Sequence, residues 1–326
     1  MSIKWQAAIF IALILASLAL TRIETSSFLS FFSTSSGASE TVSTDLSEAS
    51  SSPFFETDSV AVSRAISQTG KTLPKRKWDV LDPGIDAEGV LIQSLDEDFP
   101  FLRFRTHKTW PIASVTKLLT AVVVLEEGGE KKRVTISQNA VDTPGVAGNL
   151  VSGEVYSTED LVKIMLLTSS NDAALAFEEN AGGRETFTTL LNKKAGEIGM
   201  SDTVLHEPSG LSDLNISTAN DLLKLVKYII EKHPDILSWT RLPSILVQPI
   251  NSQTSKTLYN INPFVNDTEF LGGKTGTLPE ARQNLVSIFS FNEYRIAIIL
   301  LGSGDRIQEV PELLEWVDSA YEFYEK

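Results

Sequence analysis

The alternation of apolar and polar positions predicts that strands from the two ends of the chain form one sheet. Two apolar, β-rich runs, residues 285–291 and 294–301, are separated by Asn292-Glu293, a spacing typical of a hairpin. Near the other end, Phe101 and Arg105 belong to a short segment with the two-residue period of a half-buried strand. The predicted strands cover residues 89–94, 101–105, 269–277, 285–291 and 294–301.

The middle of the chain is predicted to be mainly helical. A strongly apolar stretch begins at Ser114 and is closed by Gly128-Gly129, a helix stop signal. Ser157 and Thr158 are candidate caps for the next helix. The predicted helices cover residues 59–68, 114–127, 159–168, 172–180, 184–198, 218–231 and 307–323.

This order of elements predicts a mixed α/β fold of the α+β type. An antiparallel sheet flanked by terminal helices, with a largely helical subdomain inserted between strands, accounts for strands at both ends and helices between them.

The first 58 residues differ from the rest. Lys4 is followed by 17 uncharged residues, a length between that of a signal peptide core and that of a bilayer-spanning helix. We therefore expect residues 1–24 to be a membrane-targeting segment. A retained anchor is favoured, and removal at Ser17-Leu18-Ala19 stays open. In residues 25–52, 16 of 28 positions are Ser or Thr, so residues 25–58 are expected to be a flexible tether and residues 59–326 the folded domain.

Charge and composition exclude several classes of protein. With 28 basic and 42 acidic residues the net charge is −14, which argues against a nucleic-acid partner. The chain contains no cysteine, so it has neither disulfides nor thiolate metal sites. Its three histidines, His107, His206 and His233, lack metal-ligand spacing and a shared context. We expect no metal, no cofactor and no histidine-based triad.

Candidate chemistry begins at Ser114-Val115-Thr116-Lys117, the only SxxK string in the chain. A serine hydroxyl becomes a good nucleophile only when a base takes its proton, and residues three apart on a helix share a face. Lys117 is therefore a candidate base for Ser114, provided that burial or a nearby cation lowers its pKa. A lone SxxK is more often a helix cap followed by a surface lysine.

Two further strings supply the remaining groups of an acyl-transfer site. In Ser169-Ser170-Asn171, Ser169 is a candidate proton relay to a leaving amine and Asn171 a ligand for a substrate amide. Lys274-Thr275-Gly276 is the only KTG string, and it follows two glycines on a predicted edge strand, where a substrate strand can pair. Lys274 and Thr275 are candidate carboxylate ligands, and the backbone N–H groups of Thr277 and Ser114 a candidate oxyanion hole.

The segments around these strings resemble the serine D-alanyl-D-alanine carboxypeptidases, which are low-molecular-mass penicillin-binding proteins. Similarity extends over roughly residues 86–303 and is carried by residues 111–121, 169–174, 207–211 and 272–277. The resemblance implies a β-lactamase/DD-peptidase-like fold for the catalytic domain. It also implies that Ser114 is acylated, that Lys117 is its base, and that Ser169 and Asn171 form the second side of the cleft. Lys274, Thr275 and Gly276 form the third side.

The same resemblance implies the partners and the location. The expected substrates are peptidoglycan stem peptides ending in D-Ala-D-Ala, whose terminal D-alanine is released before water frees the acyl-enzyme. β-Lactams are the expected covalent inhibitors. The expected place is the cell envelope, outside the cytoplasm, with attachment through the N-terminal segment. Two departures, Ser170 where Gly is common and Ala281-Arg282 in place of Ala-Gly, are candidates to alter the cleft.

Other functions remain open. A DD-endopeptidase or transpeptidase acting on cross-links would use the same residues, and a non-catalytic, membrane-tethered wall-binding protein is the third alternative. A class A β-lactamase needs a glutamate that activates the deacylating water. Glu178 and Glu179 follow the second string too closely, and Glu207 lies in the family-like Glu-Pro-Ser-Gly-Leu, so rapid β-lactam turnover is not expected.

Overall fold

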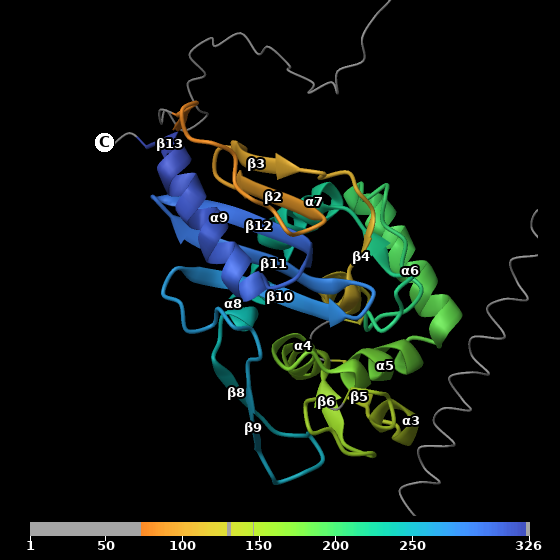
Figure 1. Cartoon of the computed structure of the whole chain (residues 1–326). Coiled ribbons are helices and arrows are strands. Elements are labelled where there is room, and N and C mark those ends of the chain that lie inside the picture. Colours follow the sequence, from red (N-terminus) through yellow and green to blue (C-terminus); the bar gives the residue numbers. More distant parts are fainter. Residues whose placement is uncertain (1–72, 129–131, 146, 324–326) are drawn as a thin grey trace, which may run out of the picture. The chain divides into compact units, whose positions relative to one another are not determined.

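The computed structural model describes residues 73–128, 132–145 and 147–323 (Figure 1). The predicted targeting segment, tether and first helix, residues 1–24, 25–58 and 59–68, lie outside the described residues. Within the described ranges, no helix is both long enough and apolar enough to span a bilayer.

A five-stranded antiparallel sheet organises the fold, with the strand order β10-β11-β12-β2-β3 (Figure 1). The sequence prediction that both ends of the chain contribute strands is confirmed, and β10, which carries the KTG string, is an edge strand as expected. The strands are β2 (Gly89–Ser94), β3 (Pro100–Phe104), β10 (Phe270–Leu278), β11 (Arg282–Phe291) and β12 (Tyr294–Ser303).

The hairpin between β11 and β12 forms where the sequence predicts it. Phe291 pairs with Tyr294, and the two connecting residues, Asn292 and Glu293, have φ angles of 46° and 67°. Positive φ at both central positions is the geometry of a type I′ turn, whose twist matches that of the flanking strands.

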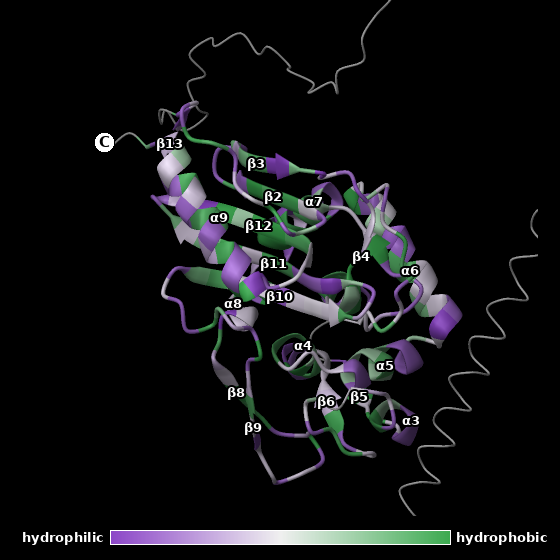
Figure 2. Ribbon diagram, viewed as in Figure 1, coloured by the Kyte–Doolittle hydropathy of each residue, from purple (hydrophilic) through white to green (hydrophobic). Residues whose placement is uncertain are grey.

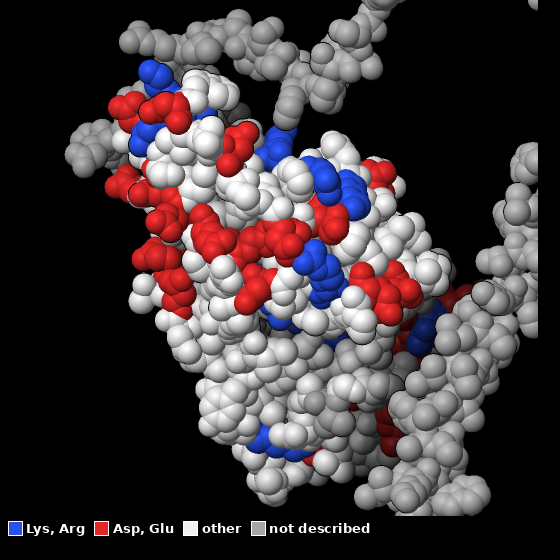
Figure 3. Space-filling model, viewed as in Figure 1, with Lys and Arg blue, Asp and Glu red and all other residues white. Residues whose placement is uncertain are grey.

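The central strands of the sheet are largely hydrophobic (Figure 2). Because successive strand residues point to opposite faces, the sheet separates two hydrophobic layers. On one face, Leu285 and Ile298 pack with α9 (Arg306–Ala320). On the other, Val286 and Ile299 join the core of the helical subdomain. The exposed side of α9 carries acidic residues, which contribute to a band of negative charge on the face shown in Figure 3.

The helical subdomain is inserted between β3 and β10, as predicted. Four of its helices begin at serine or threonine caps, because these side chains accept hydrogen bonds from otherwise unpaired first-turn N–H groups. Ser157 accepts from Asp160, and Thr218 accepts from Asp221. The helices are α2 (Thr116–Gly128), α3 (Gln138–Val141), α4 (Thr158–Leu167), α5 (Asn171–Asn180), α6 (Arg184–Ile198) and α7 (Ala219–Lys232).

The sequence did not reveal several short elements. These segments hold too few residues for a helix or strand period to be recognised. They are the helix α8 (Pro234–Thr240), the hairpin β8 (Ser244–Val247) and β9 (Lys256–Tyr259), and the paired short strands β1 (Lys75–Arg76), β4 (Trp110–Pro111), β5 (Arg133–Thr135), β6 (Val155–Ser157), β7 (Ile216–Ser217) and β13 (Tyr321–Glu322).

Two predicted boundaries need correction. Ser114 lies in a separate 3-10 turn, η1 (Ala113–Val115), ahead of α2 rather than in its first α-helical turn. The C-terminal helix ends at Ala320, because the next residues leave the helix and pair with β1 near the start of the domain.

Candidate active site

The turn that carries Ser114 is held between two glycine-containing segments. Ala113 has a φ of 49°, a left-handed conformation that is strained for an alanine. A Cβ on Gly210 would lie 2.0 Å from the carbonyl oxygen of Ala113, and a Cβ on Gly276 would lie 2.6 Å from that of Ile112. Only glycine allows both segments to approach so closely, and together they fix the backbone of the half-buried Ser114.

Lys117 is fully buried one turn beyond Ser114. Its Nζ lies 2.9 Å from Ser114 Oγ and 2.7 Å from Asn171 Oδ1, and it also donates to the carbonyl oxygen of Ser209. The expected pairing of Ser114 with Lys117 is thus present, although through a 3-10 turn.

Burial lowers the pKa of Lys117 to about 7, because the protein interior disfavours its charged form. The nearby carboxylates of Glu207 and Asp172 act in the opposite direction and raise that pKa. The amine can therefore exist in its neutral, proton-accepting form near neutral pH.

The second and third strings are joined by a hydrogen bond. Lys274, on β10, donates to Ser169 Oγ at 2.9 Å and to the backbone carbonyl of Thr275 at 2.8 Å. Ser169 adopts a φ of 58° in the loop between α4 and α5. Burial, together with the charges of Lys117 and Arg306, holds the pKa of Lys274 well below its usual range.

The eight residues predicted from the sequence lie in three neighbouring segments. Hydrogen bonds of Lys117 join Ser114 to Asn171, and Lys274 joins β10 to Ser169. Gly276 brings β10 beside the backbone nitrogen of Ser114, and the exposed Thr277 follows it on the same strand. The set comprises Ser114, Lys117, Ser169, Asn171, Lys274, Thr275, Gly276 and Thr277.

The structure also separates the SxN string of the site from the other two in the chain. Ser137 caps the short helix α3, and Ser290 lies in β11. Of the histidines, His107 contacts Asn220 and His233 contacts Glu126. Among the described residues there is no cluster of three side chains suited to a metal ion.

Comparison with known proteins decides the family. The sequence profile of the D-alanyl-D-alanine carboxypeptidases, a family of serine peptidases, matches residues 103–304, more than half of the chain. The chain belongs to this family. The fold and the membership of a serine peptidase family expected from the resemblance are therefore confirmed.

The relatives that resemble this chain carry the names of two different activities. A D-alanyl-D-alanine endopeptidase of Haemophilus influenzae is 37% identical over 59% of this chain and 65% of its own length. The D-alanyl-D-alanine carboxypeptidase DacF of Bacillus subtilis is 28% identical over 64% of this chain and 56% of its own length. The match thus spans less than two thirds of either relative.

Among solved structures, penicillin-binding protein D2 of Listeria monocytogenes, in a cefotaxime-bound form, superposes with a TM-score of 0.64 and 25% identity. That match covers 73% of this chain and 99% of the Listeria chain.

Arg306 belongs to the site but was not identified from the sequence. Its Nη1 lies 2.9 Å from Thr277 Oγ1 and 2.8 Å from the carbonyl oxygen of Gly276, and its buried Nε has no hydrogen-bond partner among the described residues. The sequence placed it beside the C-terminal helix, with no local pattern linking it to the KTG strand. Only the packing of α9 brings it there.

The two departures from the family pattern have local explanations. Ser170 is buried, accepts a hydrogen bond from the Ala173 N–H as the cap of α5, and donates to Asp172. Burial raises the pKa of that carboxyl group. Arg282 adopts a φ of 52°, which explains why glycine suits this position, and its guanidinium pairs with Asp86. Arg282 therefore alters the surface beside Thr277 and does not alter the contacts around Ser114.

Proposed function

We propose that the chain hydrolyses peptidoglycan stem peptides ending in D-Ala-D-Ala, with release of the terminal D-alanine through an acyl-enzyme on Ser114. One observation carries this proposal: the amine of the buried Lys117 is held between two carbonyl oxygens with its remaining side directed at Ser114 Oγ.

The two carbonyl oxygens determine which way the neutral amine faces. Asn171 Oδ1 and the Ser209 carbonyl can only accept hydrogen bonds, so each takes one N–H of Lys117. The lone pair of a neutral Lys117 is then left for the hydroxyl proton of Ser114, 2.9 Å away. This orientation makes Lys117 the general base of the acylation step.

The reaction then proceeds in two balanced steps. Ser114 Oγ bonds to the carbonyl carbon of the penultimate D-alanine while its proton moves to Lys117. The peptide C–N bond breaks, and the proton held by Lys117 passes through Ser169, which Lys274 orients, to the leaving amine of the terminal D-alanine, so that Lys117 is neutral again. Water next attacks the ester carbonyl and gives its proton to Lys117, which returns it to Ser114 Oγ as the ester bond breaks. The shortened peptide leaves with a new carboxylate, and the Ser114 hydroxyl is restored.

The end of β10 supplies the groups that bind the negative charges of the substrate. Lys274 and Thr275 lie on this strand, and Arg306 adds its guanidinium beside the Thr277 hydroxyl. Together these groups suit the C-terminal carboxylate of the substrate. The backbone N–H groups of Ser114 and Thr277 would receive the oxyanion of the tetrahedral intermediate. Asn171 Nδ2, which now donates to the Pro144 carbonyl, marks the opposite wall.

A DD-endopeptidase is the second candidate, because the Haemophilus influenzae relative that is named an endopeptidase is more similar to this chain than the Bacillus subtilis carboxypeptidase. The scissile bond would then join D-alanine to the side chain of another stem peptide, and the same residues would act. A transpeptidase would differ in passing the acyl group to an amine instead of water.

The proposed setting is the cell envelope, with residues 1–24 as the attachment to the cytoplasmic membrane or as a cleaved export signal. β-Lactams are proposed as covalent ligands of Ser114, since the solved Listeria relative is described with cefotaxime bound.

Intact-mass spectrometry of the full chain incubated with a penicillin, followed by peptide mapping, tests the acylation. We expect a single adduct on Ser114, and D-alanine release from diacetyl-lysyl-D-alanyl-D-alanine. An adduct without that release, but with cleavage of a cross-linked dimeric stem peptide, would favour the endopeptidase. The absence of any adduct would favour a non-catalytic wall-binding protein.

A further inference from the structure

Glu207 is a buried glutamate that the proposed mechanism does not use. We infer that it is a positioning residue for Lys117: its carboxylate holds the loop whose Ser209 carbonyl fixes the amine of Lys117 opposite Ser114. This inference rests on the proposed function, since it assumes that Lys117 activates Ser114.

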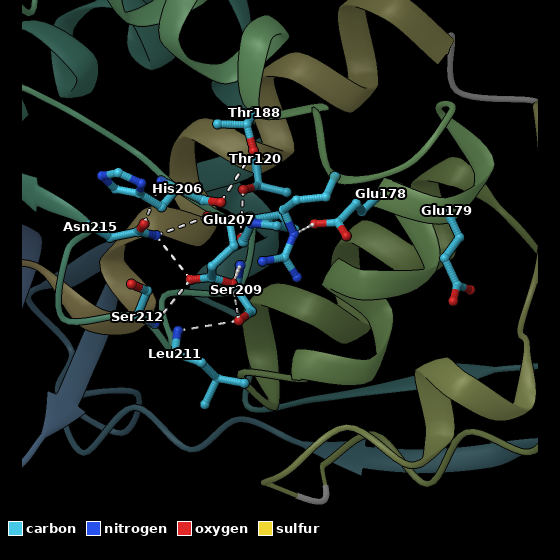
Figure 4. A network of polar contacts seen from close by, with 12 residues as sticks. Thr120, Glu178, Glu179, Thr188, His206, Glu207, Ser209, Leu211, Ser212 and Asn215 are labelled. Atoms are coloured by element: carbon cyan, nitrogen blue, oxygen red, sulfur yellow. Dashed lines mark hydrogen bonds and ion pairs between the residues drawn. The ribbon is translucent and has the colours of Figure 1, made fainter. Parts of the chain in front are cut away.

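The carboxylate of Glu207 organises its own loop through hydrogen bonds to both oxygens (Figure 4). Oε1 accepts from the backbone N–H groups of Gly210 at 2.5 Å and Ser212 at 3.3 Å, and from Asn215 Nδ2 at 3.0 Å. Oε2 accepts from the Ser209 backbone N–H at 2.7 Å and from the Ser209 hydroxyl. All five groups are donors, so the site is matched to a carboxylate and to no neutral side chain of the same shape.

The loop that Glu207 organises is attached directly to α2, the helix that follows the turn carrying Ser114. Thr120 donates from Oγ1 to the Pro208 carbonyl at 2.8 Å, and Asn215 Nδ2 lies 3.2 Å from Thr116 Oγ1. Gly210 packs against Ala113 in the turn that carries Ser114. Glu207 itself does not hydrogen-bond Lys117 in the described part of the chain, so it acts on the amine through the Ser209 carbonyl.

A cavity of about 240 Å³ adjoins this loop and gives it room to move. Without the carboxylate, the segment from Ser209 to Ser212 is free to shift into that space, and any such shift displaces the Ser209 carbonyl from its position against Lys117. The cavity is lined by Thr143, Asn171, Leu175, Arg184, Glu207, Pro208, Ser209, Leu211 and Ser212.

The charge of Glu207 gives a second, measurable consequence. The ionisable groups that act on Lys117 are the carboxylates of Glu207 and Asp172, which raise its pKa, and the facing amine of Lys274 on β10. Loss of the negative charge at position 207 therefore lowers the pKa of Lys117 further. A contribution to folding alone would not change this value.

The test is the rate of acylation by a penicillin, measured on the full chain from about pH 5 to about pH 9, because acylation requires neutral Lys117. For the unchanged chain we expect the rate to rise with a midpoint near the Lys117 pKa of about 7. In Glu207→Gln we expect the plateau to fall about 10- to 100-fold, since a displaced catalytic group costs on this scale. We also expect the midpoint to move to lower pH.

Glu207→Asp separates the two effects. Aspartate keeps the charge but is one methylene shorter, so the plateau should fall while the midpoint stays near that of the unchanged chain. The matched control is Glu309→Gln, because Glu309 is equally buried and accepts hydrogen bonds from Asp86, Ala87 and Ser303 away from the site. It should lower thermal stability and leave the pH profile unchanged.

Plateaus within about twofold of the control and an unmoved midpoint in both variants at position 207 would overturn the inference, because the displacement expected here costs far more. If Glu207→Gln does not fold, Glu207→Asp decides by its plateau alone. If the unchanged chain forms no adduct with penicillin, the proposed function itself is wrong. That outcome is distinguishable from the failure of this inference, in which the unchanged chain reacts and the variants react like it.

Discussion

Lys274 Nζ lies 2.9 Å from Ser169 Oγ, although 105 positions separate the two residues in the sequence. This hydrogen bond joins the edge strand of the sheet to the loop between α4 and α5, and so connects the sheet to the helical subdomain. Burial and the charge of Lys117 lower the pKa of Lys274. The amines of Lys117 and Lys274 are therefore poorly able to carry a proton at the same time.

Ser114→Ala should abolish the covalent adduct with penicillin and leave the fold intact. The hydroxyl is half-buried and its hydrogen bond is made to Lys117 rather than to the core, so its removal should change the melting temperature little. Intact-mass spectrometry and a thermal melt measure the two outcomes. If the Ser114→Ala variant cannot be refolded, the hydroxyl is a structural group instead.

Lys117→Ala should lower the rate of acylation by about 10²- to 10⁴-fold, the usual contribution of a general base. The affected step is the transfer of the Ser114 proton, so the loss should appear in the acylation rate constant with weaker effects on binding. Stopped-flow measurement with a chromogenic cephalosporin checks this. Unchanged acylation at neutral pH would show that another group accepts the proton.

The proposed catalytic pair could be predicted from sequence because Ser114 and Lys117 are only three positions apart. Ser169 and Lys274 were candidates from their own strings, but their contact could not be predicted from local pattern, since no local rule joins residues so far apart. Arg306 and Glu207 were not identified as part of the site, because their contacts arise only when α9 and the loop after α6 pack against other elements. Likewise, α8 and the β8–β9 hairpin are too short to show a period.

The buried Lys117 should also make stability depend on pH. Its pKa is about 7 in the folded chain, below the ordinary value for lysine, so between these values the unfolded chain binds more protons. Stability should therefore rise with pH across this window, by about 1.4 kcal/mol per pH unit from this one group.

Lys117→Met removes that contribution but keeps the apolar stem of the side chain. Denaturant unfolding between about pH 7 and about pH 10 should give a shallower rise in the free energy of unfolding for the variant. Loss of the Lys117 charge also lets the pKa of Lys274 move back towards its usual value, which makes the rise in the variant shallower still. Parallel curves for the two chains would indicate that Lys117 keeps an ordinary pKa in the folded state.

Arg306→Ala should weaken the reaction with peptide substrates that carry a free C-terminal carboxylate. A charge-assisted hydrogen bond contributes about 1.5 to 3 kcal/mol, which corresponds to a loss in kcat/KM of about 10- to 100-fold. The hydrolysis of an ester substrate that lacks the terminal carboxylate should change much less. Arg282→Ala is the matched control, because that guanidinium pairs with Asp86 on the outer rim beside Thr277. An equal loss for both substrates in Arg306→Ala would show that Arg306 supports the β10 backbone, through the Gly276 carbonyl, rather than binding the carboxylate.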